Sequence, residues 1–431
     1  MTAVRGAMRQ TFRSLAARNF RLYVIAQMIS VSGTWMQSVA QAWLVLHLTG
    51  NGVDVGIVVG LQFLPMLLFG PLGGLVADRT DKRTLLFVTQ AAGGLQALAL
   101  GLLVVTGSAA LWQVYALSAV LGVVNLFDNP ARQTFMIEMV GRDDLPNGVS
   151  LNAVVMNASR IVGPALGAVI ITVAGLGTCF LVNAASYAAV IVALAMMRTA
   201  ELHPTDPVAR AKGQVRAGVR YAWRTPVVRT TLVTVTIIGI FAYNFTVTLA
   251  LLAKGTFHGT AGTYAGMTSC MGLGAVAGGL AAAHRGRPSL RLLQRLGLAF
   301  GVLLAGVALA PTLLVAELLV VPMGAVSLAF IATANATLQL ATEPAMRGRV
   351  MALYAMAFLG TTPIGAPLVG AIAQWTSPRM ALLAGAAAIF LAVALLWERR
   401  RTIGPEGAPS PEARRAEATA VVEEEAEARA R

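Results

Sequence analysis

The chain alternates long apolar blocks with short charged segments, and this pattern limits its fold more than any other feature. A helix needs about 20 apolar residues to cross the hydrocarbon core of a bilayer. Only 12% of the residues are charged, about half the share found in soluble domains. We therefore expect an all-α membrane protein with twelve transmembrane helices. The expected spans lie near residues 22–46, 53–77, 84–106, 111–128, 149–174, 177–197, 228–252, 262–283, 290–310, 312–334, 349–374 and 379–397.

Internal repeats divide these spans into two sets of six. Residues 73–85, 129–133 and 163–170 resemble residues 278–290, 335–339 and 365–372, respectively. Each pair has nearly the same spacing and lies in an equivalent place, which indicates two pseudo-symmetric halves. Parallel repeats of this kind place a substrate site between the halves. The expected parts are a basic arm (1–21), an N-terminal half (22–197), a linker (198–227), a C-terminal half (228–397) and a disordered tail (398–431).

The basic residues lie mainly between the spans. The net charge is +14, but no basic face carries the interleaved aromatic side chains typical of nucleic-acid binding, so we expect no nucleic-acid partner. Cytoplasmic segments of membrane proteins are enriched in Lys and Arg. If the N-terminus is cytoplasmic, almost all of these cations are cytoplasmic, and Lys254 and Arg379 lie outside. This predicts a multi-pass protein of the inner (plasma) membrane with both termini in the cytoplasm.

The linker carries a regular basic pattern. Lys212, Arg216, Arg220 and Arg224 follow one another at four-residue intervals, so on a helix they form one basic stripe. Valine and tryptophan side chains supply an apolar side. The pattern predicts an amphipathic helix on the anionic inner leaflet of the bilayer. A solvated basic linker is the alternative.

The turn between the second and third spans, "GLVADRTDKR" (74–83), is short and carries both signs of charge. Such a turn can form a latch of salt bridges and helix-end contacts that holds one conformation. A plain positive anchor is the alternative, but anchoring needs only cations, and Asp78 and Asp81 argue against it. The candidate latch residues are Gly74, Asp78, Arg79, Lys82 and Arg83.

This turn also carries a family resemblance. It fits the loop signature G-x-x-x-D-R-x-G-R-R of the major facilitator superfamily, with Asp81 in place of the second glycine and Lys82 in place of one arginine. The phrases "FDNPARQTFMIEMV", "LNAVVMNASRIVGPALGA" and "LGTTPIGAPLVGAIA" resemble the secretion-effector or enterobactin-exporter-like branch, among the drug:proton antiporters. The resemblance covers residues 19–397 and implies the major facilitator fold, alternating access and proton coupling.

The fifth span carries a part of the antiporter signature G-P-x-x-G-G. Gly163, Pro164 and Gly167 match it, and Ala168 replaces the last glycine. Small residues four apart with a proline give a helix that packs closely and bends. A role in packing alone is the alternative to a role in export.

Polar residues recur along the first span at three- and four-residue spacing, and a weaker set lies on the fourth. Lipid would penalise such a face, so it either lines a wet cavity or meets other helices. The resemblance implies that helices 1, 4, 7 and 10 line the cavity. The candidate cavity residues are Gln27, Ser30, Thr34, Gln37, Gln41, Asn125, Asn157 and Arg160. Hydrogen bonding between helices alone is the alternative.

Arg160 lies deep within the fifth span. A guanidinium in hydrocarbon costs at least ~2.5 kcal/mol, so it needs water, a partner or a ligand. Arg160 shares a helical face with Asn157, Pro164 and Gly167 and should therefore face the protein interior. It either pairs with a helix-4 group such as Asp128 or offers positive charge to an anionic substrate.

Three carboxyl groups in or near the spans are candidate proton carriers: Asp54, Asp128 and Glu317. Each also fits the role of an interfacial or capping carboxylate. Asp54 is expected at the outer end of helix 2, Asp128 at the inner end of helix 4, and Glu317 about two turns into helix 10.

The sequence lacks the G-x-x-x-x-G-K-[ST] loop that binds nucleotide phosphates, and its histidines and cysteines are scattered. We expect no enzyme, no cofactor and no metal site. The expected function is secondary-active export of small amphipathic or anionic organic molecules, such as a drug, a siderophore or a secondary metabolite, by a monomeric proton antiporter. A nutrient or lipid importer and a receptor or scaffold on the same fold stay open.

Overall fold

The computed structural model describes residues 13–203, 214–285 and 288–403, and every element assigned within these ranges is a helix. The expected basic arm up to residue 12, Lys212 of the linker and the expected tail from residue 404 lie outside the described residues.

The helices fall into two groups along the chain. The first group is η1 (Arg13–Ala16), α2 (Arg18–Thr49), α3 (Gly52–Arg79), α4 (Lys82–Val105), α5 (Leu111–Ala195) and η2 (Thr199–Glu201). The second is α6 (Gln214–Arg224), α7 (Pro226–Phe241), α8 (Phe245–Leu251), η3 (Leu252–Thr256), α9 (Ala261–Arg285), α10 (Leu290–Leu309), α11 (Leu313–Ala341), α12 (Pro344–Phe358), α13 (Thr362–Trp375) and α14 (Pro378–Ile403).

The long element α5 is three helices in series. Gly141 (φ 73°, ψ 175°) and Gly175 (φ 83°, ψ 171°) interrupt it with backbone angles that only glycine adopts readily. Ten described segments are long and apolar enough to cross a membrane, and one of them contains the break at Gly175. Together with α2, which is 32 residues long but rich in polar side chains, these segments fit the twelve predicted spans.

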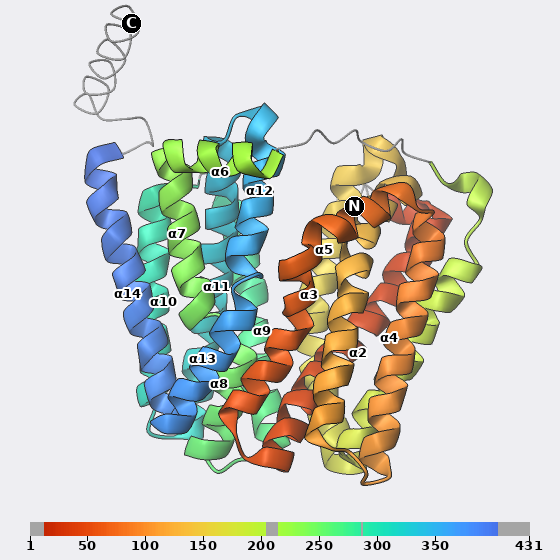
Figure 1. Cartoon of the computed structure of the whole chain (residues 1–431), viewed down its shortest axis with the longest axis horizontal. Coiled ribbons are helices and arrows are strands. Elements are labelled where there is room, and N and C mark those ends of the chain that lie inside the picture. Colours follow the sequence, from red (N-terminus) through yellow and green to blue (C-terminus); the bar gives the residue numbers. More distant parts are fainter. Residues whose placement is uncertain (1–12, 204–213, 286–287, 404–431) are drawn as a thin grey trace, which may run out of the picture.

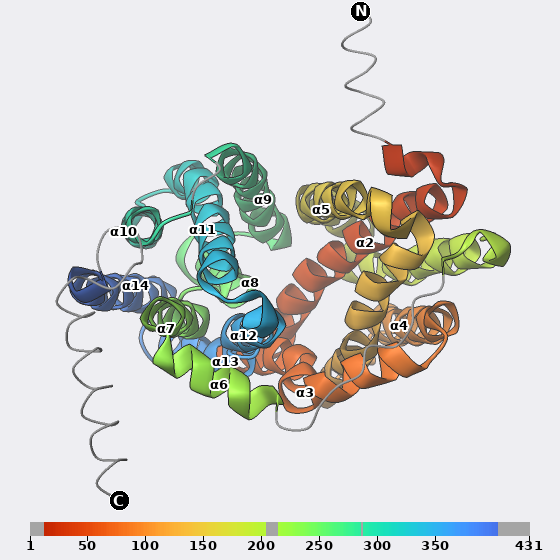
Figure 2. The ribbon, with the colours of Figure 1, turned by 90° about the horizontal axis from the view of Figure 1, so that it is seen from above.

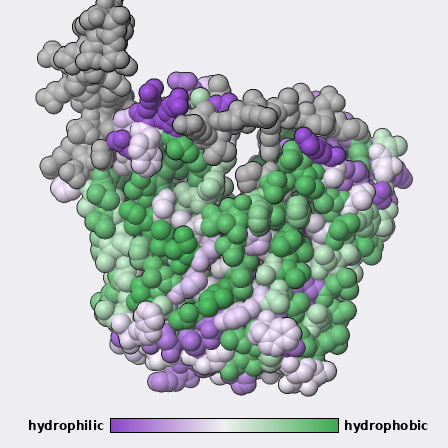
Figure 3. Space-filling view, viewed as in Figure 1, coloured by the Kyte–Doolittle hydropathy of each residue, from purple (hydrophilic) through white to green (hydrophobic). Residues whose placement is uncertain are grey.

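The two groups of helices stand side by side as two bundles (Figures 1 and 2). We call the end of the molecule that bears η1, α6 and the end of α14 the termini face, and the other end the opposite face. Apolar side chains cover the middle of the surface and polar ones gather at both ends (Figure 3). This distribution is the one a bilayer-spanning bundle requires.

Glycines bring the two bundles into close contact from the opposite face to mid-height. A Cβ atom at Gly56 of α3 would lie 2.3 Å from the backbone oxygen of Ala366 in α13. One at Gly370 would lie 2.3 Å from the oxygen of Gly52. At the opposite face itself, the Gly52 amide donates to Gln374 Oε1 at 3.0 Å. The opposite face is therefore closed.

Toward the termini face, α3 leaves this contact. Leu68, Phe69 and Leu72, in its second half, are 59%, 49% and 53% exposed. The two bundles also separate at this end in side view (Figure 1), and the space-filling surface has a notch there (Figure 3). The structure is thus closed at one face and opens toward the other.

We expect Gly56→Ala to separate the bundles at the opposite face, because its Cβ atom would meet backbone 2.3 Å away. Spin labels at Leu48 and Trp375, 38% and 81% exposed, would report the separation by double electron–electron resonance in a background without native cysteines. Gly70→Ala on the same helix is the matched control, since nothing lies within 4 Å of a Cβ atom there. Equal distance distributions in the two variants would contradict the expectation.

Candidate functional site

A buried ion pair lies inside the first bundle. Asp128 of α5 is 3% exposed and pairs with Arg132 one turn further along the same helix. Its Oδ1 accepts hydrogen bonds from Thr89 Oγ1 at 2.8 Å and from Gln90 Nε2 at 2.7 Å. The sequence placed Asp128 at the inner end of a span, but that helix continues to Gly141. The carboxylate is therefore within the bundle and not at its edge.

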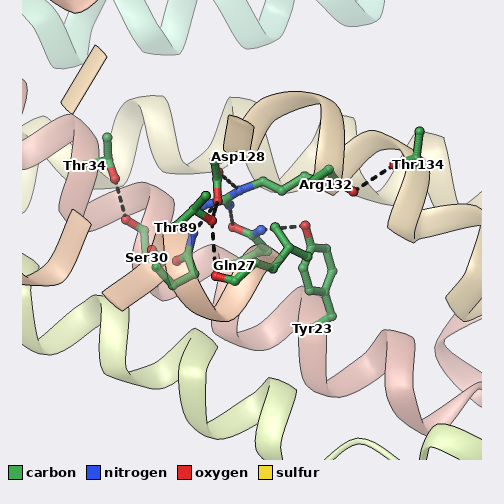
Figure 4. Close-up of polar contacts among 11 residues, drawn as sticks. Tyr23, Gln27, Ser30, Thr34, Thr89, Asp128, Arg132 and Thr134 are labelled. Atoms are coloured by element: carbon green, nitrogen blue, oxygen red, sulfur yellow. Dashed lines mark hydrogen bonds and ion pairs between the residues drawn. The ribbon is translucent and has the colours of Figure 1, made fainter. Parts of the chain in front are cut away.

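The same pair reaches across to α2. Arg132 Nη1 donates to Gln27 Oε1, and Gln27 Nε2 donates to the Tyr23 hydroxyl at 2.6 Å. Figure 4 shows these side chains converging from α2, α4 and α5. Arg132 thus links the Asp128 carboxylate to α2. Arg132 was not among the predicted site residues, although its spacing of four residues from Asp128 on one helix was a usable signal.

In this structure, four residues of the polar stripe of α2 are buried within the first bundle. Gln27, Ser30, Gln37 and Gln41 are only 1–2% exposed. Their amides find partners on neighbouring helices of the first bundle. Gln37 Nε2 donates to Gln96 Oε1 at 3.1 Å, and its Oε1 accepts from Asn183 Nδ2 at 2.6 Å. Gln41 Nε2 donates to Ser118 Oγ at 2.6 Å.

The alternative interpretation, hydrogen bonding between helices, describes this stripe. Amide side chains both donate and accept, so they can bond to one another between helices, although Gln96 Nε2 has no hydrogen-bond partner here. Thr34 is the exposed member of the stripe, and its hydroxyl donates to Ser30 O of its own helix at 3.0 Å. Asn125 and Asn157 are half-buried, and Asn157 Nδ2 donates to Ala153 O at 2.8 Å.

The glycines of the fifth span pack against α2. A Cβ atom at Gly163 would lie 2.5 Å from Ser32 O and 2.6 Å from Trp35 Cβ, and one at Gly167 would lie 3.3 Å from Met36 Cγ. No side chain fits at Gly163 without moving the α2 backbone. Pro164 is buried beside it. Gly163, Pro164 and Gly167 therefore allow the fifth span to pack closely against α2.

The charged turn at 74–83 holds α4 to the rest of the first bundle. Lys82 Nζ pairs with Glu138 Oε1 at 2.8 Å, and the two side chains are only 10% and 11% exposed. Arg83 Nε donates to Leu194 O, near the end of α5, at 2.9 Å. Gly74 and Asp78 are half-buried and Arg79 is exposed. Glu138 was missed because it stands alone in an apolar run, "FMIEMV".

Asp81 caps the start of α4. Its Oδ2 accepts a hydrogen bond from the Thr84 amide at 2.7 Å. Partial burial opposes ionisation, but hydrogen bonds from Thr84 and the nearby Arg83 and Lys82 cations outweigh it, so the pKa of Asp81 lies below its usual value. The carboxylate that replaces the glycine of the family signature is thus an N-cap.

The other two candidate proton carriers lie near the opposite face. Asp54 Oδ1 accepts a hydrogen bond from the Tyr115 hydroxyl at 2.8 Å. Glu317 stands in the second turn of α11, which begins at Leu313. Its Oε1 would lie 3.5 Å from a Cβ atom at Gly266 of α9.

Arg160 does not pair with Asp128, since Arg132 holds that carboxylate. Its guanidinium lies over the Trp35 ring of α2, 5.0 Å from the ring centroid. The expected ion pair within the first bundle is therefore absent from the described structure, and the site of Arg160 is distinct from that of Asp128.

The linker helix α6 runs along the edge of the second bundle (Figure 2). Gly218 packs on Arg349 of α12, and Ala222 is buried. Val219 and Trp223, four residues apart, are 44% and 62% exposed. An apolar pair on one exposed helix face is the arrangement of an interfacial helix.

Solved structures share this fold. A bacterial homologue of the human lysosomal transporter Spinster, in an inward-facing and unoccupied conformation, matches with a TM-score of 0.70 at 12% identity, over 89% of this chain and 96% of that one. At this identity the likeness shows the fold alone.

The profile of the transmembrane secretion effector family matches residues 9–425. The chain belongs to this family of the major facilitator superfamily, as the resemblance predicted. It is a multi-pass membrane transporter of small molecules and not an enzyme.

Relatives with assigned roles match parts of the chain. The enterobactin exporter EntS of Shigella flexneri is 23% identical over 372 residues, 83% of this chain and 86% of EntS. The staphyloferrin A transporter of Staphylococcus aureus is 30% identical over 156 residues, 36% and 39% of the two chains. The multidrug efflux pump Tap of Mycolicibacterium fortuitum is 28% identical over 218 residues, 48% and 53% of the two chains. The chain thus spans about half or less of the last two relatives.

We expect Glu138→Gln to lower the thermal unfolding midpoint in detergent strongly, because it leaves the buried Lys82 ammonium without this partner. Breaking a buried ion pair costs about 3–5 kcal/mol. The control is Glu201→Gln, which breaks the Arg198–Glu201 pair, whose side chains are 65% and 43% exposed. A surface change of this kind stays within about 0.5 kcal/mol. Similar midpoints for both variants would show that the buried pair does not stabilise the bundle.

Proposed function

We propose that this transporter is a proton-coupled antiporter that exports small amphipathic or anionic organic molecules by alternating access. The observation that carries the proposal is the buried Asp128–Arg132 pair, joined to α2 through Gln27. The names of two relatives, an enterobactin exporter and a multidrug efflux pump, support export, and that of a third, a staphyloferrin A transporter, supports transport of a small organic molecule.

The termini face is the cytoplasmic face in this proposal. Inter-span Lys and Arg concentrate at that end, as the positive-inside rule requires of cytoplasmic loops. The exposed Val219 and Trp223 of α6 then enter the inner leaflet while Arg220 and Arg224 meet its anionic headgroups. The structure, closed at the opposite face, is accordingly the inward-facing state that takes up cargo from the cytoplasm.

Proton coupling is assigned to Asp128 in preference to Asp54 and Glu317. Its carboxylate pairs with Arg132 and accepts hydrogen bonds from Thr89 and Gln90, and Arg132 also donates to Gln27 of α2. Protonation of Asp128 removes the ion pair and changes how Arg132 holds α2 against α5. Proton binding is thereby linked to the arrangement of helices, which is the requirement for coupling.

The charged turn serves as the latch. Lys82–Glu138 and Arg83–Leu194 tie the start of α4 to two parts of α5, so the first bundle moves as one body. Gly74, Asp78 and Arg79 occupy the end of α3 beside this turn. In this role the turn holds the conformation in which these contacts are made.

The test begins with a cargo, found by screening export-deficient cells with siderophores, macrolides and dyes. In proteoliposomes, Asp128→Asn should lose flux driven by a pH gradient and keep substrate counterflow, because only the proton step is removed. The double variant Asp128→Asn/Arg132→Gln removes both charges and avoids an unpaired arginine. Asp54→Asn and Glu317→Gln are the controls and should stay pH-driven.

Each other outcome has a definite meaning. Full pH-driven flux in both Asp128 variants contradicts the assignment of Asp128 as the carrier. Flux of the opposite coupling sign identifies an importer. Absence of any substrate-dependent flux in the native protein identifies a receptor or scaffold on the transporter fold.

A further inference from the structure

Arg160 lies at mid-height and at the junction of the two bundles. It stands near the midpoint of the helix between the breaks at Gly141 and Gly175, so neither membrane surface is within reach of its side chain. A Cβ atom at Gly272 of α9, in the second bundle, would lie 2.9 Å from the Arg160 backbone oxygen. Both bundles therefore meet at this residue.

One aromatic side chain from each bundle lies near the guanidinium. Trp35 of α2 lies beneath it, with the ring centroid 5.0 Å away. Tyr243, at the break between α7 and α8, is close enough to interact with it electrostatically. The Tyr243 hydroxyl donates to Ser327 O at 2.7 Å, so its proton does not take part in a hydrogen bond to a ligand at Arg160. Tyr243 therefore offers an apolar ring surface on the second-bundle side of Arg160.

The positive charge of Arg160 has no anionic partner among the described residues. None of the four ion pairs found there includes Arg160, and its buried Nε has no hydrogen-bond partner. Asp128 is held by Arg132. A cation–π contact offsets only part of the cost of desolvating a guanidinium. A charge retained in this way at the centre of a transporter marks a ligand site.

An apolar surface adjoins this cation. Tyr243 packs edge-on against Phe245 and Phe358, with ring centroids 5.2 Å and 4.9 Å away. Phe358 in turn stacks with Tyr354 at 6.2 Å. Tyr243 and Phe358 are half-buried, and Tyr243 joins this cluster to the surroundings of the guanidinium. A charged fork next to aromatic rings suits a ligand with an oxyanion at one end and an apolar ring system at the other.

We propose that Arg160 is the anion-binding residue of the cargo site and that the cargo class is an aromatic carboxylate, bound by a bidentate guanidinium–carboxylate contact. The inference rests on the proposed transport function and narrows its substrate class. It places the acid group near Trp35 and the ring system against Tyr243 and Phe358. Both bundles then contact one ligand, which couples its binding to their relative position.

The test uses a matched pair of probes that differ in charge alone. Naphthalene-2-carboxylate and naphthalene-2-carboxamide are titrated by calorimetry into the full chain in nanodiscs, without a pH gradient. We expect the native protein to bind the carboxylate more tightly. Arg160→Ala should weaken carboxylate binding roughly tenfold to a hundredfold and leave amide binding unchanged. Arg160→Lys keeps the charge but loses the planar fork, so its affinity should fall between the two.

Arg379→Ala is the control. Its guanidinium donates to Ala310 O at 2.9 Å in the second bundle, away from the junction, so carboxylate binding should stay native. Equal affinity of the native protein for both probes, or no carboxylate binding in the millimolar range, overturns the proposal without any variant. Native carboxylate preference in Arg160→Ala also overturns it. Because these titrations involve no flux, carboxylate binding without pH-driven transport would refute the antiport proposal and leave this one standing.

Discussion

A bilayer supplies no hydrogen-bond partners, and this constraint governs where every polar side chain of the protein lies. Each group must be satisfied by another part of the chain or by cargo. Gln37 of α2 forms hydrogen bonds with Gln96 of α4 and Asn183 of α5, and Gln41 of α2 forms one with Ser118 of α5. The first bundle is consequently held together by amides as well as by packing. Among the described residues, this solution leaves Arg160 Nε without a hydrogen-bond partner, as it does Gln96 Nε2 and Asn244 Oδ1.

The two buried charge systems of the first bundle do different work. Lys82 and Glu138 belong to α4 and α5, so their attraction fixes the relation between two helices. Asp128 and Arg132 belong to one helix, and their attraction alone fixes nothing between helices. That pair contacts neighbouring helices through hydrogen bonds with Thr89 and Gln90 of α4 and Gln27 of α2. The Asp128–Arg132 pair contacts other helices only through hydrogen bonds, so it is easier to rearrange than the Lys82–Glu138 ion pair, which itself joins two helices.

The architecture was readable from the sequence, because apolar block length and the internal repeats depend only on composition along the chain. The sequence did not show whether the polar stripe of α2 faces water or other helices. A polar stripe reads the same whether it borders water or other amides, and only the partner helices decide between them. Asp128 was predicted at the end of a span because polar residues follow it. The helix instead continues to Gly141, with Phe135 buried and Arg132 paired with Asp128. Glu138 gave no pattern at all.

The uncompensated charge of Arg160 has an electrical consequence. A guanidinium stays protonated throughout a transport cycle, so an organic anion bound to it is neutralised at the site but carries its own charge across the membrane. If one proton enters for each monoanion that leaves, two positive charges move inward per turnover. At about 2.3 kcal/mol per charge for each 100 mV, an inside-negative membrane potential then adds to the pH gradient. A cell that held its voltage would therefore keep extruding such an anion at an external pH equal to its own.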